Sequence, residues 1–568
     1  MRELLYLKQN LCILNYTKSY PITFDEVLST NGFEQVLLTY FAYLKKKDYK
    51  QYQWLCNYQE APDAIHKITY LLKSLIVFQL DEIVSPYLDE PKRFQYFIED
   101  LYNFWRHTNR FSLITTRTTT GLQLANFIEA DARFNQLILS LYRTIEERLQ
   151  GKKNSVYRQL NAGTNACIVT RDVPWIIPAG YEKLAGIPFL DSLMLRTPLI
   201  LHPKSNKREG SFQASADNPI LEFNGEYNDW FCYPAKIGQL TAFLYFHRDF
   251  MANGISLANL FQLANEEDFI NQKPDLICLY GIEDQREECR FYYDEVNQMH
   301  IGAVSYSDRI SYFGYLKKMS LTLHNLAVMR KNKLPVHGAM VNITLKSGST
   351  KGVIFIGDSG AGKSETIEAL RLVGDEDIAK MDIVFDDMGS ISYEDGQLYA
   401  QGTEIGAFIR LDDLEKGTAY RDMDRSIFMN PESSNARVIL PAADYDLVIQ
   451  KHKIDMVLYA NNYADVFGLL PFHTLQDAKQ TFTEGKRFAK GTTHEFGLTQ
   501  TYFANPFGPM QQQELCDTIL DQIFAAFAKH QVFIGEIFTR LGLDPDNRYG
   551  IKEAARSLLD YLHRIDQA

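Results

Sequence analysis

The sequence predicts a mixed α/β protein in which a phosphate-binding lobe follows an α-helical N-terminal region and a region of short strands. The main observation is the segment from Lys351 to Arg371, KGVIFIGDSGAGKSETIEALR, which has the order strand, glycine-rich loop, helix. The second is the helical spacing of apolar residues up to about residue 150. The third is the change, after that point, to short apolar runs separated by turn-forming residues.

The segment from Lys351 to Arg371 contains the pattern of a phosphate-binding loop, G-x-x-x-x-G-K-[ST]. In such a loop, glycines let backbone N–H groups surround a β-phosphate, the lysine reaches the β and γ oxygens, and the hydroxyl holds a divalent metal. A tight structural turn is the alternative. The sequence therefore predicts that a nucleotide is bound by Gly357, Asp358, Ser359, Gly360, Ala361, Gly362, Lys363, Ser364 and Glu365.

The composition is that of a globular protein long enough for more than one domain. Of its 568 residues, 46% are hydrophobic and 13% aromatic, which is too apolar for a disordered chain. The formal net charge of −12 argues against a nucleic-acid binder, because such proteins carry a basic face. An anionic substrate must therefore be attracted by a local basic cluster.

Cysteine usage and the N-terminus favour a reducing compartment without membrane association. The seven cysteines include no C-x-x-C pair and no spacing typical of zinc or of a disulfide framework. The first residues contain no small-residue cleavage site, and no apolar run approaches the length of a membrane span. We therefore expect a cytoplasmic protein that binds neither nucleic acid nor membrane.

Residues 1–150 are predicted to form a helical accessory domain. Apolar residues recur with helical spacing over 33–44, 64–80, 93–105 and 126–149. The aromatic residues in these segments could line a ligand site, but helix packing explains them better. No residue pattern here indicates chemistry, so we expect a domain that contacts a second copy of the chain or a protein partner.

Residues 151–310 are predicted to form a second lobe built on strands, for example over 166–170, 198–202 and 276–280. A small basic cluster follows the second of these runs. It is interpreted as a solvated loop or, alternatively, as a phosphate or carboxylate site. Its members are Lys204, Lys207 and Arg208.

Residues 311–568 contain further candidates for chemistry around the phosphate-binding loop. Two adjacent lysines, Lys317 and Lys318, lie on a predicted helix, and His337 lies on a predicted strand. A lone histidine on an apolar strand is usually a core residue. Asp386 and Asp387 are predicted to end the strand that begins at residue 383. Apolar residues followed by aspartate are typical of the second metal-holding element of a P-loop site; an exposed turn is the alternative.

Taken in order, these motifs resemble ATP-dependent phosphoenolpyruvate carboxykinase over about a third of the chain. The loop alone does not distinguish this family, because the related HPr kinases carry a very similar GDSG-x-GKSE sequence. The resemblance rests on the order and spacing of several runs. They are YFGYLKK (312–318), the histidine at 337, the loop (357–364), the two aspartates (386–387), EIGAFIR (404–410), NAR with its proline (435–441) and ADVFGLLP (464–471).

The resemblance implies a bilobal carboxykinase-like fold that converts oxaloacetate and ATP to phosphoenolpyruvate, CO₂ and ADP. It implies that Lys318, His337 and Asp387 hold a transition metal, with Mn²⁺ suited to such nitrogen and oxygen donors. A Mg²⁺ on Ser364, with Asp386 nearby, would accompany the ATP. The remaining catalytic roles implied, in binding phosphoryl or substrate oxygens and the departing carboxylate, fall to Tyr312, Lys317, Lys363 and Arg437.

The sequence departs from the family at several positions. Phe496, which with Leu498 lies in the run HEFGLT, stands where the family has an arginine against the adenine, so the nucleotide base is open. Arg410 replaces a lysine that contacts the nucleotide, and keeps the charge but not the geometry. For the arginine that would bind oxaloacetate, the nearest candidate is Arg196 in the run LRTP.

Two other functions remain alternatives. One is a kinase of the same superfamily that phosphorylates another small molecule or a protein, which the GDSGAGKSE loop favours. The other is a regulatory nucleotide-binding module without turnover. The pair Lys318 and His337 separates these hypotheses, because a simple kinase needs no second metal to hold an enolate.

Overall fold

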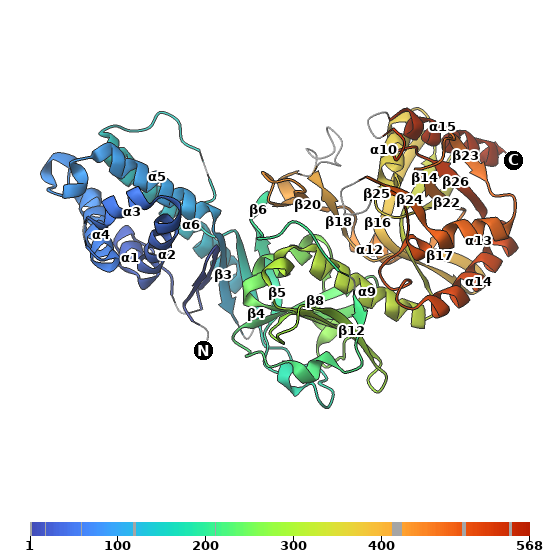
Figure 1. Cartoon of the computed structure of the whole chain (residues 1–568), viewed down its shortest axis with the longest axis horizontal. Coiled ribbons are helices and arrows are strands. Elements are labelled where there is room, and N and C mark those ends of the chain that lie inside the picture. Colours follow the sequence, from blue (N-terminus) through green and yellow to red (C-terminus); the bar gives the residue numbers. More distant parts are fainter. Residues whose placement is uncertain are drawn as a thin grey trace. The chain divides into compact units, whose positions relative to one another are not determined.

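The computed structural model describes residues 3–17, 19–57, 59–116, 121–158, 160–210, 212–411, 423–490, 496–544 and 548–567. They form a mixed α/β structure that divides into two compact units (Figure 1). Unit 1 comprises Met1–Val173 and Pro188–His202, and unit 2 comprises Pro174–Ile187 and Pro203–Ala568. The division of the chain near residues 150 and 310 stays a prediction.

Unit 1 contains the helices that the apolar spacing predicts. Their inward faces form one core, with Leu37, Phe41, Ile68 and Phe94 almost fully buried. Aromatic residues thus pack between helices, as the sequence favoured. The helices are α1 (Phe24–Ser29), α2 (Asn31–Lys47), α3 (Tyr49–Cys56), α4 (Ala61–Val77), α5 (Pro91–His107) and α6 (Gly121–Gln150).

Unit 1 also contains strands. Three of them lie in the region predicted to be helical, whereas the runs predicted over 166–170 and 198–202 do form strands. Strands β2, β3 and β4 are parallel neighbours, while β1 and β5 pair antiparallel to β2 and β4. A short apolar run has no readable period, so a strand inside a helical region is not recognised from sequence. The strands are β1 (Leu5–Lys8), β2 (Leu11–Asn15), β3 (Asn109–Thr115), β4 (Ala166–Arg171), β5 (Phe189–Leu195) and β6 (Leu199–Leu201).

The first sheet of unit 2 has the strand order β8-β9-β11-β13-β12-β7, and β10 pairs with β8. Helix α9 (Gly314–Arg330) packs against β11 and β13 and is buried over most of its length. The strands are β7 (Gln213–Ala214), β8 (Trp230–Ile237), β9 (Leu240–His247), β10 (Gln262–Leu263), β11 (Leu276–Ile282), β12 (Cys289–Asp294) and β13 (Met299–Ser305). Two short helices, α7 (Met251–Ser256) and α8 (Glu266–Phe269), accompany them.

The second sheet of unit 2 carries the phosphate-binding loop and has the strand order β21-β17-β16-β14-β15-β22-β26-β23. Successive side chains of a strand point to opposite faces. Val353 and Phe355 of β15 therefore pack toward α10 and α15, while Ile354 and Ile356 pack toward α13 and α14. Helices thus cover both faces, which explains the continuously apolar strand before the loop.

The elements of this second sheet and its helices have the following bounds. The strands are β14 (Leu334–Leu345), β15 (Thr350–Ile356), β16 (Ile378–Glu394), β17 (Gln397–Gly402), β21 (His452–Lys453), β22 (Met456–Asn461), β23 (Gly468–Pro471) and β26 (Phe533–Phe538). The helices are α10 (Lys363–Val373), α12 (Tyr445–Ile449), α13 (Leu475–Glu484), α14 (Gln513–Lys529) and α15 (Tyr549–Gln567).

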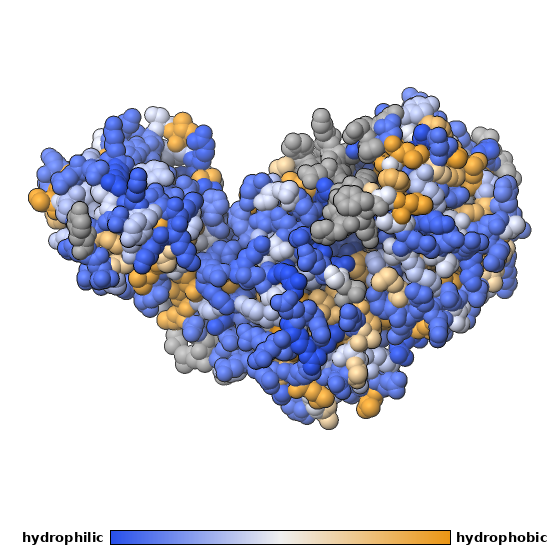
Figure 2. Space-filling model, viewed as in Figure 1, coloured by the Kyte–Doolittle hydropathy of each residue, from blue (hydrophilic) through white to orange (hydrophobic). Residues whose placement is uncertain are grey.

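Two smaller groups of strands complete unit 2. Strand β20 (Arg437–Pro441) pairs with β18 (Gly406–Arg410) and β19 (Ile427–Met429). Strands β24 (Lys486–Lys490) and β25 (Phe496–Gln500) form a separate hairpin. Figure 2 shows a mainly hydrophilic surface on one side of the molecule, with hydrophobic side chains in small groups. Within the described ranges, no helix combines the length and apolarity that crossing a membrane requires.

The structure corrects one prediction about the second sheet. The strand that contains Asp386 and Asp387 was expected to end at them, but β16 continues to Glu394. Strand β14 pairs with β16 on both sides of the two aspartates, which keeps the backbone extended through them. Strand β17 pairs with β16 only from Gly389 onward. The carboxylates therefore stand in mid-strand, just before β16 acquires its second neighbour.

Candidate nucleotide and metal site

The candidate site forms where the central strand β14 passes between β15 and β16. In the strand register, His337 is opposite Met388, and Gly338 is opposite both Asp387 and Ile356. The N–H of Gly357, the first residue of the loop, donates to the carbonyl of His337 at 3.1 Å. The sheet thus brings the histidine, the aspartates and the loop together, although they lie tens of residues apart in sequence.

Gly338 is required for this close strand packing. A Cβ at this position would lie 2.4 Å from the carbonyl oxygen of Phe355 on the neighbouring strand, well inside van der Waals contact. The order His-Gly in the sequence thus places a functional side chain directly before a residue that must lack one.

The glycine-rich loop has the backbone conformation that its sequence predicts. Gly360 and Gly362 have φ values of 80° and 100°, which L-residues with a side chain rarely adopt. Helix α10 begins directly after Gly362. Three polar side chains hold the loop in place: Asn462 donates to Gly360 O at 3.0 Å, Thr539 donates to Ala361 O at 2.8 Å, and Asp358 anchors its start.

Asp358 is the buried anchor of the loop. Its carboxylate accepts from the Ser359 N–H at 2.7 Å, from Arg487 Nε at 2.9 Å and from the Thr501 hydroxyl at 3.0 Å. Burial opposes ionisation, but His337 and Arg487 lower the pKa of Asp358 below its usual value. The carboxylate therefore stays ionised and fixes the loop against the β24–β25 hairpin.

Lys363 and Ser364 begin α10, at the positive end of its dipole. The buried Lys363 ammonium donates to the carbonyls of Gly357 at 2.7 Å and Asp358 at 3.2 Å. The exposed Ser364 hydroxyl donates to Asp386 Oδ1 at 2.7 Å. A hydroxyl joined to a strand carboxylate is the arrangement that holds Mg²⁺ in P-loop sites. Glu365 follows in the first turn of the helix.

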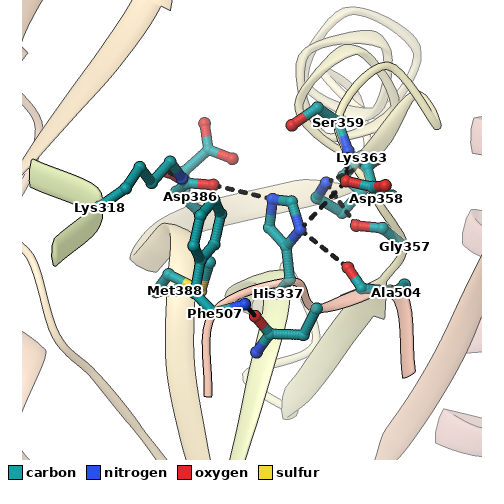
Figure 3. A network of polar contacts seen from close by, with 12 residues as sticks. Lys318, His337, Gly357, Asp358, Ser359, Lys363, Asp386, Met388, Ala504 and Phe507 are labelled. Carbon is teal, nitrogen blue, oxygen red and sulfur yellow. Dashed lines mark hydrogen bonds and ion pairs between the residues drawn. The ribbon is translucent and has the colours of Figure 1, made fainter. Parts of the chain in front are cut away.

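Asp387 is the centre of the second half of the site. Its Oδ2 lies 2.7 Å from Lys317 Nζ and 2.9 Å from Lys318 Nζ, and its Oδ1 lies 3.0 Å from His337 Nε2. Figure 3 shows His337 between Lys318 on one side and Asp358 and Lys363 of the loop on the other. The structure thus brings together the three residues for which the sequence predicted a shared metal.

The protonation states of these groups follow from burial and from their neighbours. Burial opposes ionisation of Asp387, yet Lys317 and Lys318 hold its pKa well below its usual range. Burial lowers the pKa of Lys318, Lys317 acts in the same direction, and Asp387 opposes them. Burial, followed by Lys363, lowers the pKa of His337. The site therefore favours a charged Asp387 beside a neutral imidazole.

The hydrogen bonds of His337 determine which nitrogen of the neutral ring carries the hydrogen. Its Nδ1 lies 2.9 Å from the carbonyl oxygen of Ala504, and because a carbonyl only accepts, Nδ1 carries the hydrogen. In the neutral ring, Nε2 then bears a lone pair that faces the carboxylate of Asp387. Two electron-rich atoms at 3.0 Å are stabilised by a shared cation or proton.

Ala504 reaches His337 through an unusual backbone. Phe503 and Ala504 have φ values of 50° and 48°, in the left-handed region that residues with a side chain occupy at a cost of about 1 kcal/mol each. Asn505 stabilises the segment by donating to Pro335 O at 3.3 Å. Strain of this kind often accompanies a functional site. Here it places the carbonyl that fixes the tautomer of His337.

Three side chains of the site carry donor atoms suited to a divalent metal: Lys318, His337 and Asp387. Groups that bind one ion at about 2 Å lie roughly 3 Å from one another, as do the nitrogens of His337 and Lys318 from the oxygens of Asp387. Among the described residues, there is no group of three or more His, Cys, Asp and Glu side chains arranged for a metal. A metal site here therefore depends on Lys318 as a neutral nitrogen ligand, as the resemblance implies.

Glu404, between β17 and β18, is a second carboxyl group at the lysines. The sequence alone assigned it no role. Its Oε2 lies 2.7 Å from Lys317 Nζ, and both side chains are almost fully buried. Lys317 and Lys318 lie near the positive end of α9, where cations are disfavoured, and Asp387 and Glu404 are the carboxyl groups beside them. Burial raises the pKa of Glu404 to about 7, although Lys317 opposes the shift.

The raised pKa of Glu404 predicts a pH-dependent stability. The carboxyl group has an ordinary pKa of 4.5 and a pKa of about 7 in the folded protein, so the native state holds its proton between these two pH values. Its stabilising contribution is complete below pH 4.5 and is lost as the pH rises through 7, by roughly 3 kcal/mol. As the pH is raised from 5 to 8, the thermal midpoint of the wild type should therefore decrease relative to that of Glu404→Gln. Parallel pH profiles of the two proteins would contradict this assignment.

Aromatic rings join the lysines to further cationic groups. Phe408 lies 5.9 Å from Lys317 Nζ, 5.7 Å from the Arg437 guanidinium and 5.8 Å from the ring of Tyr312. Burial raises the pKa of Tyr312, while the guanidinium groups of Arg437 and Arg208 act in the opposite direction. Arg410 is the cross-strand neighbour of Arg437 in the register of β18 and β20. The predicted residues Tyr312, Lys317, Arg410 and Arg437 thus gather in one part of unit 2.

Arg208, a member of the predicted basic cluster, lies near Tyr312 and Lys318. Its guanidinium lies 5.1 Å from the ring centre of Phe212 and 5.5 Å from that of Phe507, and Lys318 Nζ lies 4.6 Å from the same Phe507 ring. The other two lysines of the cluster form ion pairs with neighbouring carboxylates instead. One edge of the guanidinium is engaged, because Nη1 donates to the carbonyl oxygen of Gly210 at 2.6 Å.

Arg196, the sequence candidate for binding oxaloacetate, is engaged within unit 1. Its Nε donates to Asp131 Oδ2 at 3.0 Å, and its Nη2 contacts the same oxygen. Asp131 is fully buried and also accepts from Ser112 and Thr164. The arginine thus balances a buried carboxylate.

The hairpin expected to face the nucleotide base lies beside the loop. Asn462, which holds Gly360, also accepts from the N–H of Phe488 at 2.8 Å. Phe488 and Leu498 are cross-strand neighbours, exposed by 36% and 56%. Phe496 pairs with Lys490 at the start of β25; the side chain of Phe496 lies outside the described residues.

Several groups of the site were missed because they are remote in sequence. Arg487 on β24, Ala504 and Asn462 act through backbone or buried contacts that no local motif reports. Glu404 could have been recognised from the sequence, since it begins the EIGAFIR run. Comparison with protein-family models finds none that matches this chain, and comparison with curated proteins finds no match either.

Proposed function

We propose that the protein catalyses a phosphoenolpyruvate carboxykinase-type reaction, in which oxaloacetate and ATP yield phosphoenolpyruvate, CO₂ and ADP. The observation that carries the proposal is the convergence of Lys318 and His337 on Asp387, beside a P-loop whose Ser364 is joined to Asp386. A kinase that only transfers a phosphoryl group does not require the cluster of Lys318, His337 and Asp387.

The reaction needs two kinds of charge stabilisation. Cleavage of a C–C bond releases CO₂ and leaves an enolate, whose oxygen then attacks the γ-phosphorus while ADP departs. A metal bound by Lys318, His337 and Asp387 would supply positive charge to the enolate oxygen. The proposed Mg²⁺ on Ser364 and Asp386 would accompany the phosphates of ATP.

The chain's own cations have separate roles in this proposal. Lys363 exchanges its carbonyl partners in the loop for the β and γ oxygens of ATP. Lys317, held by two carboxylates, keeps its charge because Asp387 and Glu404 raise its pKa against the effect of burial. Arg437 and Arg208, near Tyr312, are placed to bind the carboxylate or phosphoryl oxygens of the substrate.

A coupled assay for phosphoenolpyruvate tests the proposal. Purified protein receives oxaloacetate, ATP, Mg²⁺ and Mn²⁺, and we expect turnover that His337→Ala removes. The matched control is His452→Ala, because His452 is also buried and bonded in the same sheet but contacts Asn342 and the carbonyl of Leu447. Turnover in His337→Ala equal to that of the control would contradict the role of His337.

A kinase of the same superfamily with another substrate is the second candidate. It is favoured by Arg196, which is occupied by Asp131 rather than available to a dicarboxylate, and by Glu365, which follows Ser364 as in the HPr kinases. The same assay separates the two functions. Absence of phosphoenolpyruvate, together with a thermal shift by MgATP that depends on Lys363, would favour the kinase. In that case the substrate is another small molecule or a protein.

A further inference from the structure

Unit 1 contains a cavity of about 400 Å³, a size at the lower end of small-molecule sites. It does not involve any residue assigned above to nucleotide or metal binding. The cavity is lined by Tyr16, Thr17, Tyr20, Ile114, Thr115, Thr116, Asn126, Phe127, Ala130 and Val169.

The cavity lies at the carboxyl ends of parallel strands. Tyr16 and Thr17 directly follow β2, Thr115 and Thr116 end β3, and Val169 lies near the end of β4. The three strands are adjacent and parallel, and β3 connects to β4 through α6, which supplies the opposite wall. The cavity is therefore bounded by strand ends on one side and by helix α6 on the other.

The lining of the cavity indicates what kind of ligand fits. Tyr16 stacks on Tyr20 with ring centres 5.2 Å apart, and Phe127 meets Tyr16 edge-on at 6.2 Å. Ile114 and Val169 add flat aliphatic surface. The described lining residues include no Lys, Arg, Asp or Glu. Among these described residues a charged group finds no ion-pair partner, which favours an uncharged ligand surface against the rings.

Hydrogen-bonding groups are present at defined positions. The Thr17 hydroxyl donates to Asn15 Oδ1 at 2.6 Å and accepts from the N–H of Thr115 at 3.0 Å. This hydroxyl retains one lone pair, and the exposed carboxamide of Asn126 offers both donors and an acceptor. A ring with polar atoms on its edge can satisfy both groups.

We propose that this cavity is a binding site for a small, uncharged, planar ring with a polar edge, of the chemical class of the nucleobases. Flat rings gain most from aromatic walls, and aromatic contacts contribute beyond the area they bury. The proposal is independent of the reaction in unit 2. Unit 1 would thereby serve as a ligand-binding unit rather than only as a partner-contacting one.

Adenine, an uncharged planar purine, is the probe, and cyclohexanol is the non-planar control. Binding to the full-length chain is measured by saturation-transfer NMR with a titration. We expect adenine to bind and cyclohexanol not to bind. Phe127→Leu removes one aromatic wall and should weaken binding about three- to tenfold. Ala130→Leu fills the cavity and should abolish binding.

Phe134→Leu is the matched control. Phe134 also lies on α6, meets the ring of Tyr16 edge-on at 5.9 Å and is as buried as Phe127, but it does not line the cavity. It should leave adenine binding unchanged while costing similar stability. The half-exposed position of Tyr20 allows Tyr20→Ala as a further lining variant that keeps the core intact. The proposal is overturned if adenine does not bind, or if binding persists in Ala130→Leu and Tyr20→Ala.

Discussion

Replacement of Asp387 by asparagine is expected to lower activity strongly and to destabilise unit 2. The carboxylate forms ion pairs with buried Lys317 and half-buried Lys318 and faces His337, so its loss leaves like charges close together in a medium of low dielectric. Removal of one partner of a buried ion pair costs about 3 kcal/mol or more. Turnover should fall by on the order of 10²–10³-fold, because the proposed metal loses its only anionic ligand.

Asp386→Asn is the matched control for this change. Asp386 is the preceding residue of the same strand, but its carboxylate accepts from the Ser364 hydroxyl rather than from a cation. Burial raises the pKa of Asp386, so removal of its charge should cost little stability. We expect Asp386→Asn to weaken MgATP binding while the thermal midpoint stays close to that of the wild type. Equal thermal midpoints for the two variants would be inconsistent with the charge cluster around Asp387.

Replacement of Lys363 by alanine is expected to remove nucleotide-dependent function and to leave the fold intact. The ammonium contacts only carbonyls of its own loop among the described hydrogen bonds, and Asp358, Asn462 and Thr539 hold that loop independently. Without the lysine, charge that develops on the γ-phosphate loses a preorganised donor. We expect a loss of about 10²–10³-fold in turnover.

The measurement is a thermal shift on addition of MgATP, followed by the phosphoenolpyruvate assay. Lys346→Ala serves as the control, because Lys346 also donates to a backbone carbonyl, that of Asp375 at 3.4 Å, but is exposed and outside the loop. The control should retain the full thermal shift. A Lys363→Ala protein that still responds to MgATP would show that the loop does not bind the nucleotide phosphates.

Local structure could be predicted wherever a segment carries its own signal. The loop from Gly357 to Ser364 was recognisable because its glycines, lysine and hydroxyl are adjacent, and the structure has the strand and helix on either side. Helices α2, α4 and α5 were recognisable from one apolar face. Strands β2 and β3 were not, because runs of five to seven residues match no single period.

The role of the two aspartates could be predicted only in part. Apolar residues followed by Asp386 and Asp387 indicated a strand with carboxylates, which is correct, but not that the strand continues. Continuation depends on pairing with β14, and sequence distance does not reveal register. Arg196 shows the same limit: a motif-like run suggested a substrate contact, whereas the fold pairs the arginine with Asp131.

By itself the sequence determined the residue types of the site: a lysine and hydroxyl beside glycines, two adjacent lysines, a histidine and paired aspartates. Only the tertiary structure decided which of them meet, and in what protonation state. Asp387 faces two lysines and a histidine because β14, β16 and α9 pack together, and burial then sets their pKa values. Charges interact through space, and the distances that govern them are fixed by packing between segments, not by order along the chain.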